Sequence, residues 1–205
     1  LCDDRGVVLI FDEVQTGFGR TGRMWASEHW NVTPDVMCVA KAMGGGLPIG
    51  ATISKAEIMD SLKVGEHSST FGGNPLVCAA ACATIDVILE EKQPERVQYL
   101  GEYFKEILQR MVDEFKVLRE ARGLGLMLGL ESRFSVYNVL MKAIENGLIL
   151  LYSGRNVIRF LPPLIIEKNH LEKAAEILEK IFAEEEKNLT ERGKSPISSS
   201  KSIQP

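Results

Sequence analysis

The sequence predicts an α/β fold with two parts: the C-terminal part of a large domain with a mainly parallel sheet, then a small C-terminal α/β domain. The first part contains continuous apolar runs rich in β-branched residues, VVLIF (7–11) and VMCVA (36–40), which are typical of strands buried on both faces. Glycine-rich loops follow these runs. The pattern changes near residue 116, where shorter strand patterns interrupted by glycine begin.

Each remaining element follows from its local pattern. GATIS (50–54) resembles the first two strands, and Asn74-Pro75 begins a helix because proline is favoured in a first helical turn. Helical spacing of apolar residues predicts further helices, and apolar runs beside glycine predict further strands. These expected elements are helices over 95–115, 135–146 and 170–188, and strands within 117–132, 148–152 and 156–161.

Domain boundaries are expected at two changes in composition. Residues 1–92 would be the C-terminal part of the large domain, and residues 93–187 a linking helix and the small domain. Residues 188–205 are polar and serine-rich towards their end, which predicts a disordered tail. The chain opens without methionine and almost at once enters a buried type of strand, so we expect an N-terminal portion to be missing.

Composition narrows the functional classes. A net charge of −4 argues against nucleic-acid binding, and the apolar runs are too short to span a membrane. The polar, acidic start is unlike a secretory signal. The four cysteines form no C-x-x-C pair, which favours a reduced, cytoplasmic protein, and the three histidines show no metal-ligand spacing.

The segment GFGRTG (17–22) matches the dinucleotide-binding fingerprint G-x-G-x-x-G. In that fold the first glycine directly follows the strand, but here five residues (12–16) intervene. The next strand ends in Lys41 rather than in the acidic residue that would bind a ribose. An NAD(P)-dependent oxidoreductase that uses GFGRTG therefore remains only an alternative.

Asp12 and Lys41 each follow a predicted parallel strand. Ligands of open α/β sheets bind beyond the carboxyl ends of the strands, so we expect both side chains in one crevice. A lysine that forms a Schiff base and an acid that keeps a pyridinium nitrogen protonated are what a pyridoxal 5′-phosphate (PLP) enzyme requires. The alternative is a plain Asp–Lys ion pair at the end of a sheet.

Longer motifs favour the PLP interpretation. LIFDEVQTGFGRTG, PDVMCVAKAMGGGLPIGA, HSSTFGGNPLVCAAA, RGLGLMLGLE and NVIRFLPPL occur in this order along the chain. With these motifs the sequence resembles the class III (subgroup II) PLP-dependent aminotransferases, most closely their acetylornithine and lysine-biosynthesis branch. The resemblance extends to about residue 185 and implies the fold of type I PLP-dependent transferases.

The resemblance implies a role for each matching residue around the cofactor ring. Lys41 would form the Schiff base and then act as general acid/base, and Asp12 would pair with the ring nitrogen. Val14 would pack against one ring face and Gln15 would lie near the ring 3′-oxygen. A core valine and an ordinary loop amide are the alternatives for these two residues.

Three further residues would bind anionic groups. Ser69 and Thr70 would bind the cofactor phosphate, which in the family belongs to the neighbouring subunit's cofactor. Their alternative role is turn chemistry at the entry to a helix. Arg159 would bind the substrate α-carboxylate through its guanidinium fork, unless it is an edge-strand arginine that reaches solvent.

The expected activity is a ping-pong amino transfer. The amino donor would be an ω-amino or N-acetylornithine-like compound, the acceptor 2-oxoglutarate, and the protein a homodimer with shared active sites. In this family the N-terminal half supplies a phosphate loop and the second ring-stacking residue. A non-catalytic fragment or subunit that needs this missing half is therefore a further alternative.

Overall fold

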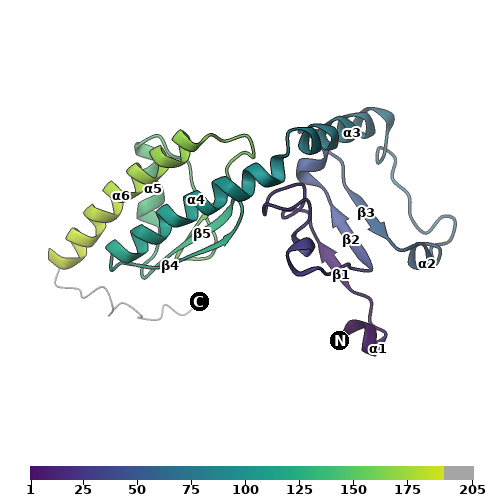
Figure 1. Cartoon of the computed structure of the whole chain (residues 1–205), viewed down its shortest axis with the longest axis horizontal. Helices are drawn as coiled ribbons and strands as arrows, with labels where there is room; N and C mark the ends of the chain where they lie inside the picture. Colours follow the sequence, from purple (N-terminus) through teal and green to yellow (C-terminus); the bar gives the residue numbers. More distant parts are fainter. Residues whose placement is uncertain (192–205) are drawn as a thin grey trace. The chain divides into compact units, whose positions relative to one another are not determined.

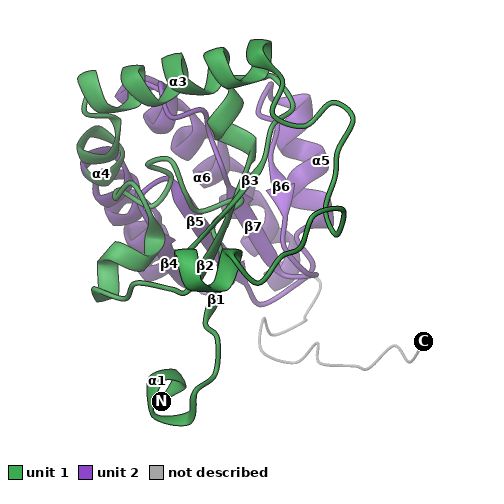
Figure 2. Cartoon of the chain, turned by 90° about the vertical axis from the view of Figure 1, so that its right-hand side faces the viewer, with its two compact units in different colours: residues 1–98 green, residues 99–205 purple. Residues whose placement is uncertain are grey.

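The computed structural model describes residues 1–191, and the chain divides into two compact units, Leu1–Gln98 and Tyr99–Pro205 (Figure 2). Helix α4 (Gln93–Glu114) contributes its first turns to unit 1 and the remainder to unit 2. Helix α6 (Lys168–Glu191) includes residues 188–191, so these four are helical and not part of a disordered tail. The rest of the expected tail, 192–205, lies outside the described residues.

Unit 1 contains a three-stranded sheet with the order β1-β2-β3. β1 (Ile10–Asp12) pairs in parallel with β2 (Val36–Val39), as expected, and Asp12 lies opposite Cys38. β3 (Ala51–Ser54) runs antiparallel to β2, so the interpretation of 50–54 as another strand of parallel type is wrong. The connection between β2 and β3 holds only the 3₁₀ turn η2 (Lys41–Gly44), which is too short for the crossover that a parallel strand requires.

The apolar run VVLIF is more exposed than its composition predicts. Val7, Val8 and Ile10 are 55%, 51% and 60% exposed, and only the end of the run is a strand. Val7 and Val8 precede β1 and belong to no strand, and within residues 1–191 none of these three side chains packs into the small core of unit 1 around Phe18, Val39 and Ile88. Burial on both faces, expected from the sequence, is therefore not observed.

Helix α3 (Pro75–Glu90) begins where the sequence predicts. The Asn74 side chain caps it by accepting a hydrogen bond from the Val77 N–H, and Pro75 occupies the first turn. α3 contacts η2, and Ile88 joins Phe18 and Val39 in the small core of unit 1. The short elements of this unit are α1 (Cys2–Arg5), η1 (Ala26–Trp30) and α2 (Ala56–Met59).

Unit 2 contains an antiparallel sheet with the order β4-β5-β7-β6, of which β4 and β5 are labelled in Figure 1. Its strands are β4 (Leu118–Leu124), β5 (Met127–Ser132), β6 (Leu151–Tyr152) and β7 (Val157–Phe160). One face packs against α4, α5 (Tyr137–Glu145) and α6, because alternate strand residues are apolar. Leu128, Leu130, Ile158 and Phe160 are all buried.

The helices of unit 2 supply the rest of its core through side chains at helical spacing. Phe104, Leu108 and Met111 of α4 are buried, as are Leu171, Leu178 and Phe182 of α6. The opposite helix faces carry the charged residues. None of the helices in residues 1–191 combines the length and apolar character that a membrane crossing requires.

Candidate functional site

Asp12 and Lys41 lie at the same edge of the unit 1 sheet. β1 ends at Asp12, and β2 ends two residues before Lys41, in the parallel pair that puts Asp12 opposite Cys38. Both side chains are exposed. One Asp12 carboxylate oxygen accepts a hydrogen bond of 3.0 Å from the Val14 N–H, which directs the carboxylate along the turn that follows β1. The structure therefore leaves an acid and a lysine accessible at neighbouring strand ends.

Asp12 and Lys41 do not form the plain ion pair that was the alternative interpretation. Among the described residues neither side chain takes part in an ion pair. Lys41 also has a left-handed backbone, with φ of 48°. Such a conformation costs a non-glycine residue about 1–3 kcal/mol and is concentrated at functional sites. An unpaired lysine held at this cost requires an explanation other than surface charge.

The glycines of GFGRTG allow close packing against neighbouring side chains. A side chain at Gly17 would meet the ring of Trp25 at 2.9 Å, and one at Gly22 would meet Gln98 of α4 at 2.9 Å. The segment continues into the short 3₁₀ helix η1 and not into the long helix whose N-terminus binds a pyrophosphate. The dinucleotide-binding alternative has no support in this geometry.

The glycines after Lys41 allow η2 to approach helix α3. A Cβ atom at Gly45 would lie 2.6 Å from the Thr84 hydroxyl oxygen, and the Gly45 backbone is left-handed with φ of 59°. Only glycine combines this conformation with this contact. The glycines therefore fix the segment that carries Lys41 against α3.

Gly45→Ala is expected to lower the free energy of unfolding by about 1–3 kcal/mol, because alanine would be strained there and would collide with Thr84. Urea unfolding of the chain measures this change. Introducing Gly45→Ala into a Thr84→Ala background removes the collision but keeps the backbone strain. Gly45→Ala should therefore cost less stability in that background than in the parent chain. Equal losses with and without Thr84 would contradict the proposed contact.

Val14, Gln15, Ser69 and Thr70 occupy loops. Val14 and Gln15 are half-buried in the turn after Asp12. Ser69 and Thr70 are exposed ahead of α3, and the Ser69 hydroxyl accepts a hydrogen bond of 2.9 Å from the Gly72 N–H. Ser69 therefore makes the helix-entry turn that was its alternative role, and this contact leaves its hydroxyl hydrogen available to an anion.

Arg159 lies on β7, which is an interior strand between β5 and β6, so the edge-strand alternative is wrong. It lines a cavity of about 550 Å³ in unit 2 whose other walls are mostly apolar. Its Nε atom is buried and has no hydrogen-bond partner among residues 1–191. A buried guanidinium nitrogen without a partner is costly, which favours an anion as its ligand.

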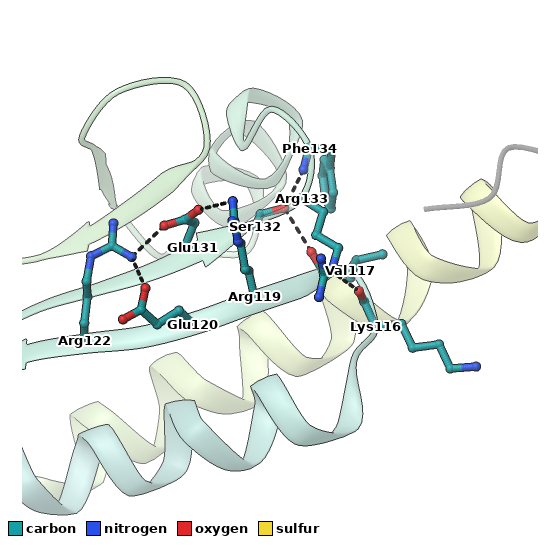
Figure 3. Close-up of polar contacts among 9 residues, drawn as sticks. All are labelled: Lys116, Val117, Arg119, Glu120, Arg122, Glu131, Ser132, Arg133 and Phe134. Carbon is teal, nitrogen blue, oxygen red and sulfur yellow. Dashed lines mark hydrogen bonds and ion pairs between the residues drawn. The ribbon is translucent and has the colours of Figure 1, made fainter. Parts of the chain in front are cut away.

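A second arginine lies in the same row of the sheet but is already neutralised. Gly129 of β5 lies opposite Arg122 of β4 on one side and opposite Arg159 of β7 on the other, so the three residues share one face of the sheet. Arg122 forms ion pairs with Glu131 at 2.6 Å and Glu120 at 2.8 Å (Figure 3). Glu131 also pairs with Arg119, because a β-bulge shifts the register between Leu118 and Glu120.

This network lowers the pKa of Glu131. The main cause of the lowered pKa is the hydrogen bond from Arg122, and Arg119 lowers it further. A carboxylate with a lowered pKa in the folded state stabilises the fold above its unfolded pKa, and this contribution is lost as the pH falls through the folded value. The pH window therefore begins near the ordinary value of 4.5 and extends below it.

Glu131→Gln is expected to lower stability at neutral pH by roughly 1 kcal/mol and to flatten the loss of stability below pH 4.5. Chemical unfolding at a series of pH values measures both effects. Glu120→Gln is the matched control, since Glu120 pairs with the same arginine but its side chain is 55% exposed. An equal effect of both variants would show that Glu131 has no special place in the network.

Sequence reasoning missed Glu13, which is 2% exposed although it lies next to Asp12. Its carboxyl group accepts hydrogen bonds from the Ser27 N–H at 2.9 Å and from the Thr16 hydroxyl. The only sequence signal is an acidic residue at the end of an apolar strand, and Asp12 alone explained that signal.

Comparisons with known proteins show the family of this chain. A family model described as "Aminotransferase class-III" matches residues 1–182. Acetylornithine aminotransferase from Methanocaldococcus jannaschii is 47% identical over 184 residues, which are 90% of this chain and 46% of that protein. The [LysW]-aminoadipate semialdehyde/glutamate semialdehyde transaminase from Sulfolobus acidocaldarius is 42% identical over 176 residues, which are 86% of this chain and 46% of that protein.

Solved structures give the same result. The structure of ornithine delta-aminotransferase from Plasmodium falciparum matches with a TM-score of 0.87 and 38% identity, over 92% of this chain and 50% of that one. Acetylornithine aminotransferase from Elizabethkingia anophelis matches with a TM-score of 0.84 and 38% identity, over 89% and 47%. The chain spans about half the length of the curated relatives it matches. It belongs to the class-III aminotransferase family and has the α/β fold of these transferases.

Proposed function

We propose that this chain provides the lysine, the acid and the substrate-binding arginine of a PLP-dependent aminotransferase. The observation that carries the proposal is the pair of strand ends in unit 1. Asp12 and Lys41 are accessible at one edge of the β1–β2 sheet, and neither is neutralised by an ion pair among the described residues. The match to the class-III family supports the same activity.

The residues at this edge fit PLP. Its protonated ring would supply an electron sink for negative charge at the substrate Cα. Asp12 would accept a hydrogen bond from the ring nitrogen and keep it protonated, since Val14 N–H engages only one of the two carboxylate oxygens. The half-buried Val14 and Gln15 would contact the ring face and the ring 3′-oxygen.

Lys41 would hold the cofactor covalently and later move a proton. Once released, its Nζ would take a proton from the substrate Cα and return it to the cofactor C4′ atom, which requires a neutral amine. Among the described residues no carboxylate engages the Lys41 side chain, so its Nζ is accessible to the cofactor, which supports the assignment.

The anion-binding roles complete the site. Arg159 would bind the substrate α-carboxylate with its guanidinium fork, which the partnerless Nε supports. Ser69 and Thr70 would bind a cofactor phosphate ahead of α3, in a homodimer whose subunits share active sites. The proposed substrates are an ω-amino or N-acetylornithine-like donor and 2-oxoglutarate. We also propose a cytoplasmic location, which the four free cysteines support.

The test is an amino-transfer assay with PLP, 2-oxoglutarate and one donor at a time: N-acetylornithine, ornithine or 4-aminobutyrate. It is run on the chain alone and on the assembled protein, defined as this chain with a polypeptide that supplies the half of the relatives' sequence it does not match. Glutamate formation by the assembled protein is expected, fastest with N-acetylornithine. No transfer with any donor, in an assembled protein that is folded and saturated with PLP, would contradict the proposal.

The assay also tests the alternative that this chain is a non-catalytic fragment or subunit needing another half. If the chain needs the other half, glutamate should form only after assembly. Equal rates for the chain alone and the assembled protein would show that residues 1–205 are sufficient.

A further inference from the structure

We infer that Glu13 is a positioning residue of the cofactor site, which holds the turn that carries Asp12, Val14 and Gln15. The inference rests on the proposed function, because it assigns to Glu13 the placement of residues that would contact PLP. Glu13 itself does not face the site. It is 2% exposed, whereas Asp12 is exposed and Val14 and Gln15 are half-buried.

The burial of this side chain requires specific partners. A carboxyl group removed from water is strongly destabilising unless its oxygens accept hydrogen bonds. Here each oxygen has a donor: Oε1 accepts from the Ser27 N–H at 2.9 Å, and Oε2 accepts from the Thr16 hydroxyl. Ser27 is itself buried and belongs to η1, fourteen positions along the chain. The carboxyl group therefore joins the end of β1 to η1.

The backbone of Glu13 is bound on both sides as well. Its N–H donates to the Cys38 carbonyl of β2 at 2.9 Å, and its carbonyl accepts from the Gly17 N–H at 3.0 Å. The first bond extends the β1–β2 pairing by one residue beyond Asp12, and the second closes the turn over residues 13–17. Asp12 precedes this fixed residue and Val14 follows it directly.

The same turn is closed on its far side. A Cβ atom at Gly17 would lie 2.8 Å from the Glu13 carbonyl oxygen and 2.9 Å from the Trp25 ring. Trp25 directly precedes η1, which supplies the Ser27 N–H. Glu13, Gly17 and the segment 25–27 thus form one packed unit. Loss of the Glu13 carboxyl group would leave the Ser27 N–H without its partner and release the turn from η1.

Displacement of the turn that carries Asp12 would lower the rate of amino transfer. Side chains that bind a cofactor must be held within a fraction of an ångström by groups that lie behind them. A shift of about 1 Å, caused by a change remote from the reacting atoms, can lower a rate about 100-fold. If Glu13 acts in this way, its contribution depends on hydrogen-bond acceptors and not on its charge.

The experiment compares two substitutions in the assembled protein. Glu13→Met keeps the length of the side chain but removes both acceptors. Glu13→Gln keeps the shape: its amide oxygen can accept from Ser27 N–H, and its NH₂ group can donate to a rotated Thr16 hydroxyl. Glu57→Met is the matched control, because Glu57 is an exposed glutamate of unit 1 on α2, away from η1. Measurements are kcat, KM, PLP affinity and the circular dichroism of bound PLP, below the unfolding temperature of every variant.

Glu13→Met is expected to lower kcat about 100-fold and to reduce the dichroism of bound PLP, while Glu13→Gln and Glu57→Met stay within about threefold of the parent. Two results would overturn the inference: a folded Glu13→Met variant with unchanged kcat and dichroism, or a Glu13→Gln variant as impaired as Glu13→Met. The parent protein separates the two claims. If the parent forms no PLP adduct at Lys41, the proposed function fails. If the parent forms the adduct and Glu13→Met is unaffected, only the positioning role of Glu13 is refuted.

Discussion

Lys41→Ala is expected to abolish measurable amino transfer in the assembled protein and to prevent covalent attachment of PLP. The variant loses the covalent anchor and the base that moves the proton, and a general base alone contributes about 10²–10⁴-fold to a rate. We therefore expect kcat to fall by at least about 10³-fold. Steady-state assays of glutamate formation measure the rate, and absorbance spectroscopy follows the attached cofactor.

Lys55→Ala provides a matched control for this prediction. Lys55, like Lys41, lies close after a strand of the unit 1 sheet, but its ammonium group pairs with Asp35 at 2.5 Å. The hydrogen bond from Lys55 to Asp35 raises the pKa of Lys55, so this amine stays protonated and is a poor nucleophile. Lys55→Ala should keep both PLP attachment and activity. Equal losses in the two variants would mean that Lys41 has no particular role.

Asp12→Asn is expected to give the second largest effect, a decrease in kcat of about 10²–10³-fold with a smaller change in KM. Asparagine has the same shape and can still accept the Val14 N–H, so the turn should be retained. Its amide has no negative charge with which to keep a ring nitrogen protonated, and the transition state would lose that stabilisation. Parallel measurements of kcat, KM and thermal unfolding distinguish this loss from misfolding.

The control for Asp12→Asn is Asp60→Asn, which changes another exposed aspartate of unit 1. It should leave kcat unchanged. Asp12→Glu keeps the charge but moves it by one methylene group, so partial activity is expected. Full activity of Asp12→Asn would show that the acid at the end of β1 does not act on the cofactor.

The local sequence pattern was sufficient to predict the strands that position Asp12 and Lys41. β1 begins within the run VVLIF and ends at Asp12, β2 covers most of the run VMCVA, and their pairing is parallel as expected. The cap at Asn74 also follows from local chemistry. These features depend on residues close together in the sequence, so a single sequence contains the information.

Features that depend on distant neighbours could not be predicted in the same way. The interior position of Arg159 follows from strand order, which no local pattern specifies. The exposure of Val7 follows from its place outside both β1 and the core of unit 1. The burial of Glu13 depends on the Ser27 N–H, fourteen residues away. The direction of β3 follows from the short connection after Lys41, a constraint that a count of residues would have revealed.

The central claim is that Lys41 carries the cofactor, and peptide mapping tests it most directly. The assembled protein is incubated with PLP, treated with borohydride to fix the linkage, digested and analysed by mass spectrometry. The account predicts one phosphopyridoxyl group, on the peptide that contains Lys41, and none after Lys41→Ala. Modification of a different lysine, or equal modification in Lys41→Ala, would contradict it.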